Sequence, residues 1–114
     1  MEINCGEIWW VDFGGSKGHE YQKTRPVLVI ESNQQLKITT VITIIPLTHQ
    51  KKNQHKDDVV ILRDSRNNLI YDSVLKMHHI LSFDRSRFKK RIGRVDEEIL
   101  VQVKRYLKRH FGIE

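Results

Sequence analysis

The 114-residue chain contains one cysteine, Cys5, and only two prolines and six glycines. A lone thiol cannot form an intramolecular disulfide, and it excludes zinc sites built from several cysteines. Few prolines and glycines, together with 39% hydrophobic residues, argue against a disordered chain. The composition therefore predicts one globular domain over residues 1–114, with a single small core.

Long apolar runs are also missing, and none approaches the length of a membrane span. The N-terminus, residues 1–4 (MEIN), is neither basic nor apolar enough for a signal peptide. We therefore expect no membrane contact. A cytoplasmic location is expected, which a single cysteine fits.

Acidic residues are fewer than basic ones, so the formal net charge is +6 and the isoelectric point about 9.6. This balance favours a polyanionic partner. Residues 85–94 carry six cations and no acid, and Arg85 and Arg87 begin this run. We predict that the run contacts phosphates, the alternative being a solvated charged turn.

Short segments rich in β-branched and aromatic residues recur along the chain and predict strands. The expected strands cover residues 6–13, 25–31, 39–47, 58–62 and 73–78, with shorter ones at 82–83 and 91–93. A turn is expected at residues 33–35. The pattern predicts a mainly β fold, a small antiparallel barrel or half-barrel closed by one C-terminal helix.

The helix has a full set of local signals. Asp96 can cap its start, Val95 and Leu100 have the spacing of a hydrophobic staple, and Gly112 can end it. An apolar stripe at helical period comprises Ile99, Leu100, Val103, Tyr106, Leu107 and Phe111. We expect this stripe to cover one face of the sheet.

Arg25 and Thr48 are the candidate catalytic residues. Pro26 belongs at the start of a strand, and the residue before a proline is held extended, so Arg25 stands at a strand rim. If the second and third strands pair through residues 33–38, Arg25 and Thr48 meet at their far ends. A guanidinium and a hydroxyl could then hold a phosphate and stabilise its cleavage. The alternative is two unrelated surface residues.

Other polar and aromatic residues extend this candidate site. His19 and Glu20 lie in the long loop before Arg25, and His19 could carry a proton. Trp9 and Trp10 point to opposite faces of the first strand, so one is expected in the core and the other exposed for base stacking.

The remaining histidines predict no metal site. His78 and His79 are neighbours on an expected strand and point to opposite faces, so they cannot easily bind one ion together. His49 and His55 lie in a polar loop, where solvation is expected. No cofactor is expected.

Several segments together resemble the MazF/PemK family of toxin endoribonucleases, in order and spacing, over nearly the whole chain. They are residues 6–12 (GEIWWVD), 18–20 (GHE), 24–30 (TRPVLVI), 46–48 (PLT), 72–74 (DSV), 80–87 (ILSFDRSR), 92–93 (IG) and the final helix. The resemblance implies an SH3-like barrel, usually a homodimer, that cleaves single-stranded RNA at short motifs without a metal. It implies 2′-hydroxyl attack, leaving 2′,3′-cyclic phosphate and 5′-hydroxyl ends.

The resemblance also implies roles for particular residues. Arg25 matches the family's catalytic arginine, and Thr48 its catalytic threonine. His19 and Glu20 fall in the substrate loop. A cognate antitoxin, whose disordered tail occupies the RNA groove, is the implied protein partner.

The chain departs from the family at residues 79–84 (HILSFD), where relatives often have QIRTID or QPRTID. His79 replaces the glutamine and Leu81 the arginine, so an altered cleavage motif is expected. The missing arginine keeps two alternatives open. One is a non-catalytic module that binds nucleic acid or a peptide, and the other is a chain that binds an antitoxin but has lost activity.

Overall fold

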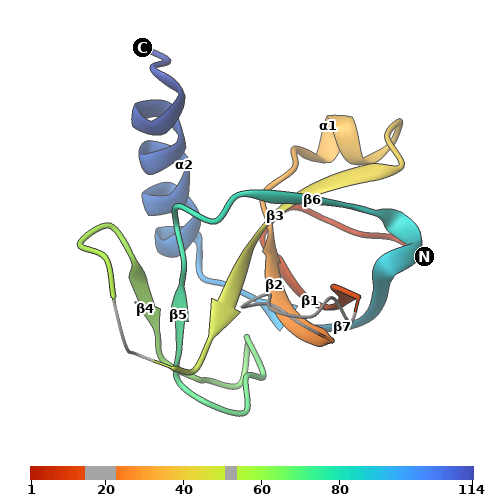
Figure 1. The fold of residues 1–114 in the computed structure, drawn as a ribbon, viewed down its shortest axis with the longest axis horizontal. Coiled ribbons are helices and arrows are strands. Elements are labelled where there is room, and N and C mark those ends of the chain that lie inside the picture. Colours follow the sequence, from red (N-terminus) through yellow and green to blue (C-terminus); the bar gives the residue numbers. More distant parts are fainter. Residues whose placement is uncertain (15–22, 51–53) are drawn as a thin grey trace.

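The computed structural model describes residues 1–14, 23–50 and 54–114 of the chain. Figure 1 shows a strongly curved sheet with a C-terminal helix beside it, which confirms the predicted mainly β fold. The elements are β1 (Glu7–Asp12), β2 (Thr24–Val29), α1 (Asn33–Leu36), β3 (Val41–Thr48), β4 (Val59–Ile61), β5 (Ser73–Leu75), β6 (Leu81–Asp84), η1 (Arg85–Arg87), β7 (Phe88–Arg94) and α2 (Glu97–Phe111).

Strand β3 organises the sheet because it pairs with three others. Its first half runs antiparallel to β6, and its last two residues pair with β5. On its other side it pairs with β2, which is followed by β1 and β7. One long strand that changes neighbours along its length bends the sheet into a half-barrel.

Strand β2 is buried on both faces, as its unbroken apolar sequence predicted. The side chains of Val27, Leu28 and Val29 are all 0% exposed. Leu28 belongs to the core cluster that includes α2, whereas Val27 and Val29 belong to a second cluster inside the curve of the sheet. Full burial of each such side chain is worth about 1.5–3 kcal/mol, so β2 is held rigidly between two cores.

Helix α2 begins and ends where its local signals place it. Asp96 has extended backbone at the N-cap, and Gly112 ends the helix in the left-handed region at φ 66°. Leu100 and Val103 are buried, and Val95 packs in the same cluster. Phe111 was expected in the apolar stripe, but it is 59% exposed, because the helix extends beyond the sheet at this point.

Three further expectations need correction. The strand expected at residues 73–78 ends at Leu75, and the chain then turns so that Lys76 reaches Asp58 in a buried ion pair of 2.7 Å. The turn expected at 33–35 is a one-turn helix, because the Ser32 hydroxyl accepts a hydrogen bond from the Gln35 backbone. The short strand expected at 91–93 is the longer β7.

Gly93 in β7 marks a close approach between two backbones. A Cβ atom at this position would lie 2.5 Å from the carbonyl oxygens of Arg66 and Asn67. The next residue, Arg94, donates its backbone N–H to the Arg66 carbonyl. Within the described residues, no helix is long and apolar enough to cross a membrane.

Candidate active site

A groove of about 560 Å³ opens where β1, β2, β3 and β7 meet the turn before β5. Strand rims supply one part of the lining and the turn at residues 68–71 supplies the other. The lining residues are Trp10, Lys23, Thr24, Arg25, Pro26, Leu47, Thr48, His49, Asn68, Leu69, Ile70, Tyr71, Ser73, Lys90, Arg91 and Ile92.

Arg25 and Thr48 both line this groove, as the hairpin of the second and third strands predicted. Val27 of β2 pairs with Pro46 of β3, and continuing this antiparallel register by two residues sets Arg25 across from Thr48. On its other side Arg25 pairs with Val11 of β1. The arginine is therefore held on a strand with neighbours on both sides, and both candidate side chains are half-buried.

The Thr48 hydroxyl is oriented by its local backbone. Its Oγ1 accepts a hydrogen bond of 3.2 Å from the Gln50 backbone N–H. A hydroxyl has one proton and two lone pairs, so this bond uses a lone pair and leaves the proton to donate. The arrangement suits donation of a hydrogen bond to an anionic oxygen in the groove.

The electrostatic character of the groove is positive. Lys23, Lys90 and Arg91 lie around Arg25, and the described lining contains no aspartate or glutamate. Lys23 has a positive φ of 66°, which orients the chain as it enters β2. These cations are placed to receive a chain of phosphates rather than a single charge.

Arg91 of β7 is held by the carboxylate of Glu7 on the neighbouring strand β1. Its Nε donates to Glu7 Oε2 at 2.9 Å, while the Trp9 indole and the Asn4 backbone N–H donate to Glu7 Oε1. Burial of Glu7 opposes its ionisation, but these hydrogen bonds outweigh burial and hold its pKa below the ordinary value. Glu7 therefore stays ionised and orients Arg91.

Two aromatic surfaces border the groove. Tyr71 is 58% exposed, and its ring stacks on that of His49 with centroids 4.8 Å apart. Trp10 is half-buried and lines the groove, whereas Trp9 packs in the core against Phe88. The predicted core tryptophan is therefore Trp9, whereas Trp10 is half-buried and not fully exposed as expected.

Arg85, Arg87 and His79, which were predicted to bind substrate, are absent from the described lining of the groove. The Arg85 guanidinium donates to the carbonyls of Leu36 and Thr39, so it braces the end of α1. Arg87 is exposed and its Nη1 lies 3.4 Å from the Asp12 carbonyl, beside the end of β1. His79 follows β5 and is absent from the described lining. His19 and Glu20 lie outside the described residues.

Sequence reasoning missed the wall formed by residues 68–71. Asn68 has a positive φ of 54°, and its side-chain amide donates to the Ile92 carbonyl of β7. Asparagine tolerates this left-handed conformation, so the Asn67–Asn68 pair was the available signal for a tight turn. The basic run at residues 85–94 does reach the groove, through Lys90 and Arg91.

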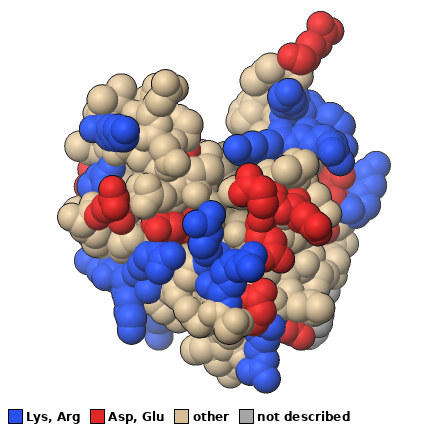
Figure 2. All heavy atoms as spheres, turned by 180° about the vertical axis from the view of Figure 1, so that it is seen from behind, with Lys and Arg blue, Asp and Glu red and all other residues tan. Residues whose placement is uncertain are grey.

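Basic side chains also gather away from the groove. Figure 2 shows the reverse face, where Lys and Arg cluster over the C-terminal part of α2 and along the opposite lower edge, with Asp and Glu between them. The last turn of α2 contributes Lys108 and Arg109. The net charge of +6 is thus divided into patches, and the groove is one of them; its described lining contains no acid, although Glu7 pairs with Arg91 from outside that lining.

The curved sheet, the terminal helix and the basic groove define a small half-barrel protein. Residues 4–111 match the family model described as PemK-like, MazF-like toxin of type II toxin-antitoxin system. The chain therefore belongs to this toxin family.

Relatives agree with this assignment. Endoribonuclease MazF6 of Mycobacterium tuberculosis is 31% identical over 111 residues, covering 96% of each chain. Endoribonuclease EndoA of Bacillus subtilis is 24% identical over 103 residues, covering 90% of this chain and 89% of its own.

Solved structures have the same fold. MazF from Deinococcus radiodurans superposes with a TM-score of 0.77 at 24% identity, covering 96% of each chain. An endoribonuclease in complex with its cognate antitoxin, from a mycobacterial species, gives a TM-score of 0.73 at 14% identity and covers 98% of this chain and 95% of its own.

Proposed function

We propose that this protein is the toxin of a type II toxin–antitoxin system and a sequence-selective endoribonuclease that cleaves single-stranded RNA without a metal ion. The observation that carries the proposal is the placement of Arg25 and Thr48 across neighbouring strands in one basic groove. Family membership and relatives named as endoribonucleases support the same activity.

In the proposed reaction the RNA supplies its own nucleophile. The 2′-oxygen of one nucleotide attacks the adjacent phosphorus, a bond from O2′ to phosphorus forms, and the bond from phosphorus to O5′ breaks. The 2′-hydroxyl proton is removed and the departing 5′-oxygen gains a proton. The products are a 2′,3′-cyclic phosphate and a 5′-hydroxyl.

Arg25 and Thr48 act on the charge that develops during this reaction. The guanidinium stabilises the negative phosphoryl oxygens and takes part in proton transfer, and the Thr48 hydroxyl donates a further hydrogen bond. Donors fixed in advance on rigid strands are effective because they need no rearrangement as the charge appears. Burial of β2 between two cores supplies that rigidity.

The rest of the groove positions the RNA. Lys23, Lys90 and Arg91 contact neighbouring phosphates, while Trp10 and the Tyr71–His49 stack offer faces for splayed bases. His19 and Glu20 are proposed to contact the substrate from the loop before β2. Arg85, whose guanidinium binds backbone carbonyls, is proposed as a bracing residue instead of a phosphate contact.

Base selection is proposed to differ from that of relatives that carry arginine at position 81. Leu81 begins β6 and is partly buried against the core cluster inside the curved sheet. It therefore contributes packing where such relatives have a charged side chain. A binding module without catalysis remains the second candidate, and Leu81 is the observation that favours it.

The proposed partners are RNA, an antitoxin and a second copy of the chain. Structures titled MazE-MazF and endoribonuclease with cognate antitoxin share the fold of this chain. A groove rich in cations is suited to an acidic disordered tail, which would exclude RNA by occupying the same surface. A homodimer is proposed from the family resemblance.

The test is RNA cleavage in excess EDTA by the wild-type protein and by Arg25→Ala. Loss of one fixed donor to a developing anion typically costs about 10²–10³ in kcat, so a loss of this size is expected. Arg105→Ala is the matched control, because this arginine is exposed on α2. Equal rates for wild type and Arg25→Ala would overturn the catalytic assignment, and salt-sensitive RNA binding without products would favour the binding module.

A further inference from the structure

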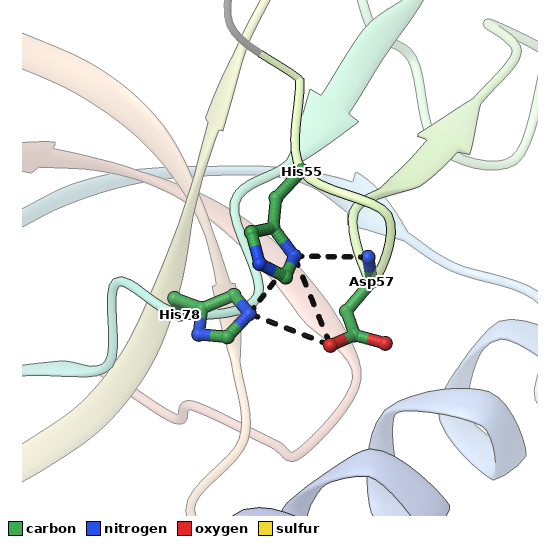
Figure 3. A group of neighbouring side chains, drawn as sticks. All are labelled: His55, Asp57 and His78. Carbon is green, nitrogen blue, oxygen red and sulfur yellow. Dashed lines mark hydrogen bonds and ion pairs between the residues drawn. The ribbon is translucent and has the colours of Figure 1, made fainter.

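Three side chains outside the groove converge on one point. His55 and Asp57 come from the connection between β3 and β4, and His78 comes from the turn after β5 (Figure 3). His55 Nδ1 lies 3.1 Å from His78 Nε2, and Asp57 Oδ2 lies 3.8 Å from the first nitrogen and 3.5 Å from the second. The described lining of the groove includes none of these residues.

The triangle formed by these atoms has the dimensions of a metal site. Zinc binds imidazole nitrogen and carboxylate oxygen at about 2.0–2.2 Å in tetrahedral geometry, which separates neighbouring ligand atoms by about 3.3–3.5 Å. The point equidistant from the three atoms lies about 2.0 Å from each of them. The space between the three ligand atoms therefore matches the size of one ion.

The ligand atoms are oriented by further hydrogen bonds. Arg109 of α2 donates to Asp57 Oδ1 at 3.2 Å, so Oδ2 is the carboxylate oxygen directed toward the histidines. The Asp57 backbone N–H donates to His55 Nδ1, which shows that this nitrogen is unprotonated; a bound ion would replace the N–H at this lone pair. Such outer contacts commonly set ligand orientation and affinity in metal sites.

A buried ion pair holds the two ligand-bearing segments together. Asp58 is paired with Lys76, and it also accepts hydrogen bonds from the backbone N–H groups of His55 and Met77. These contacts join the residues next to Asp57 to the residues next to His78. The site is therefore pre-organised by the fold, independently of any ion.

We propose that His55, Asp57 and His78 bind one divalent metal ion of the zinc class, with water completing its coordination. The side chains of His55, Asp57 and His78 are 48%, 24% and 40% exposed, so an ion can enter from solvent. Two imidazoles and one carboxylate favour zinc over magnesium, which prefers oxygen ligands in an octahedral arrangement.

The bound ion would have a structural effect near the groove. It would link the connection that follows Thr48 to the turn after β5, and Asp57 already joins that connection to α2 through Arg109. We expect the ion to stabilise the folded chain by mass action, since it binds the native arrangement of the three ligands. RNA cleavage at Arg25 and Thr48 does not pass through this ion.

The experiment is titration of the metal-stripped full chain, carrying no polyhistidine tag, with Zn²⁺ and separately with Mg²⁺ by calorimetry. One Zn²⁺ per chain is expected, with a rise in Tm and no response to Mg²⁺. His78→Ala and Asp57→Asn should each weaken Zn²⁺ binding at least about tenfold and remove the rise in Tm. His79→Ala, which changes the neighbouring histidine, is the control and should bind Zn²⁺ like the wild type.

Arg109→Ala provides a second, independent variant, because it keeps all three ligands and removes only the contact to Asp57 Oδ1. A loss of affinity of about 10–100-fold is expected. Wild-type chain that binds no Zn²⁺, or that binds it equally well after His78→Ala and Asp57→Asn, would overturn the proposal. The RNA cleavage test is run in EDTA, which removes any bound Zn²⁺. The proposed nuclease activity and the proposed Zn²⁺ site can therefore each fail without the other.

Discussion

Arg25 and Thr48 lie across the β2–β3 pair, two residues beyond the pairing of Val27 with Pro46, and both line one groove. This relationship follows from the antiparallel register, so it does not depend on a flexible loop. The end of the β2–β3 pair therefore positions both side chains without a bound ligand.

Thr48→Val should lower kcat and leave the fold intact, because it replaces a hydroxyl with a methyl group of similar size. A hydrogen bond to a charged group is worth about 1.5–3 kcal/mol, so we expect kcat to fall roughly 10- to 150-fold. Thr43→Val on the same strand is the control, since that hydroxyl pairs with Ser82 and lies outside the groove lining. An unchanged kcat for Thr48→Val would remove Thr48 from the mechanism.

Tyr71→Ala should weaken RNA binding more than it slows the chemical step. Stacking of a base on an aromatic ring is worth about 1–3 kcal/mol, which predicts an increase in Kd of roughly 5- to 150-fold. Tyr71→Phe keeps the ring and should bind like the wild type. Fluorescence anisotropy with a short RNA measures both variants, and equal binding by Tyr71→Ala would show that no base stacks here.

Stability should depend on Glu7 in acid. Hydrogen bonds hold its folded pKa below the ordinary glutamate value, so its contribution is complete above that ordinary value and is lost as pH falls through the folded pKa. Glu7→Gln should lose about 1.5–3 kcal/mol or more at pH 7, because several donors lose a charged acceptor.

Urea unfolding of wild type and Glu7→Gln at pH 7 and at pH 3 measures this difference. The gap in unfolding free energy between the two proteins should narrow at the lower pH, because below the ordinary glutamate pKa the unfolded chain takes up a proton at Glu7 more readily than the folded chain does. A gap of the same size at both pH values would mean that the charge of Glu7 contributes nothing.

Gly93→Ala should destabilise the fold, because the added Cβ would meet two backbone carbonyl oxygens at 2.5 Å. Forced overpacking of this kind costs about 1–3 kcal/mol, which corresponds to a fall in Tm of several degrees. Gly112→Asn serves as the control, since a Cβ added at this position meets nothing within 4 Å and asparagine tolerates positive φ. Equal melting temperatures for wild type and Gly93→Ala would contradict the close packing.

The parts of the fold that were predictable from the sequence depend on local chemistry. Pro26 and the apolar residues after it specify a strand start and a strand buried on both faces. Asp96, Val95 and Gly112 specify the bounds of α2. The proximity of Arg25 and Thr48 could also be predicted from the sequence, because it requires only that two consecutive strands of similar length form a hairpin.

The features of the fold and site that the sequence did not predict depend on tertiary contacts. Whether Arg85 or Lys90 reaches the groove is decided by register, and the β1–β7 pairing contains irregularities on either side of Trp10. The contact between His55 and His78 joins residues 23 positions apart, and it arises because β5 ends early at Leu75. No local pattern in the sequence specifies either feature.

The most direct measurement is the chemistry of the RNA ends produced in excess EDTA. Self-attack by the 2′-hydroxyl predicts fragments with a 5′-hydroxyl, which polynucleotide kinase labels without prior phosphatase treatment, and a 2′,3′-cyclic phosphate, which mass spectrometry identifies. The proposed mechanism predicts both ends, with their formation abolished or strongly slowed in Arg25→Ala. Fragments with 5′-phosphates, or cleavage that stops when EDTA is added, would contradict it.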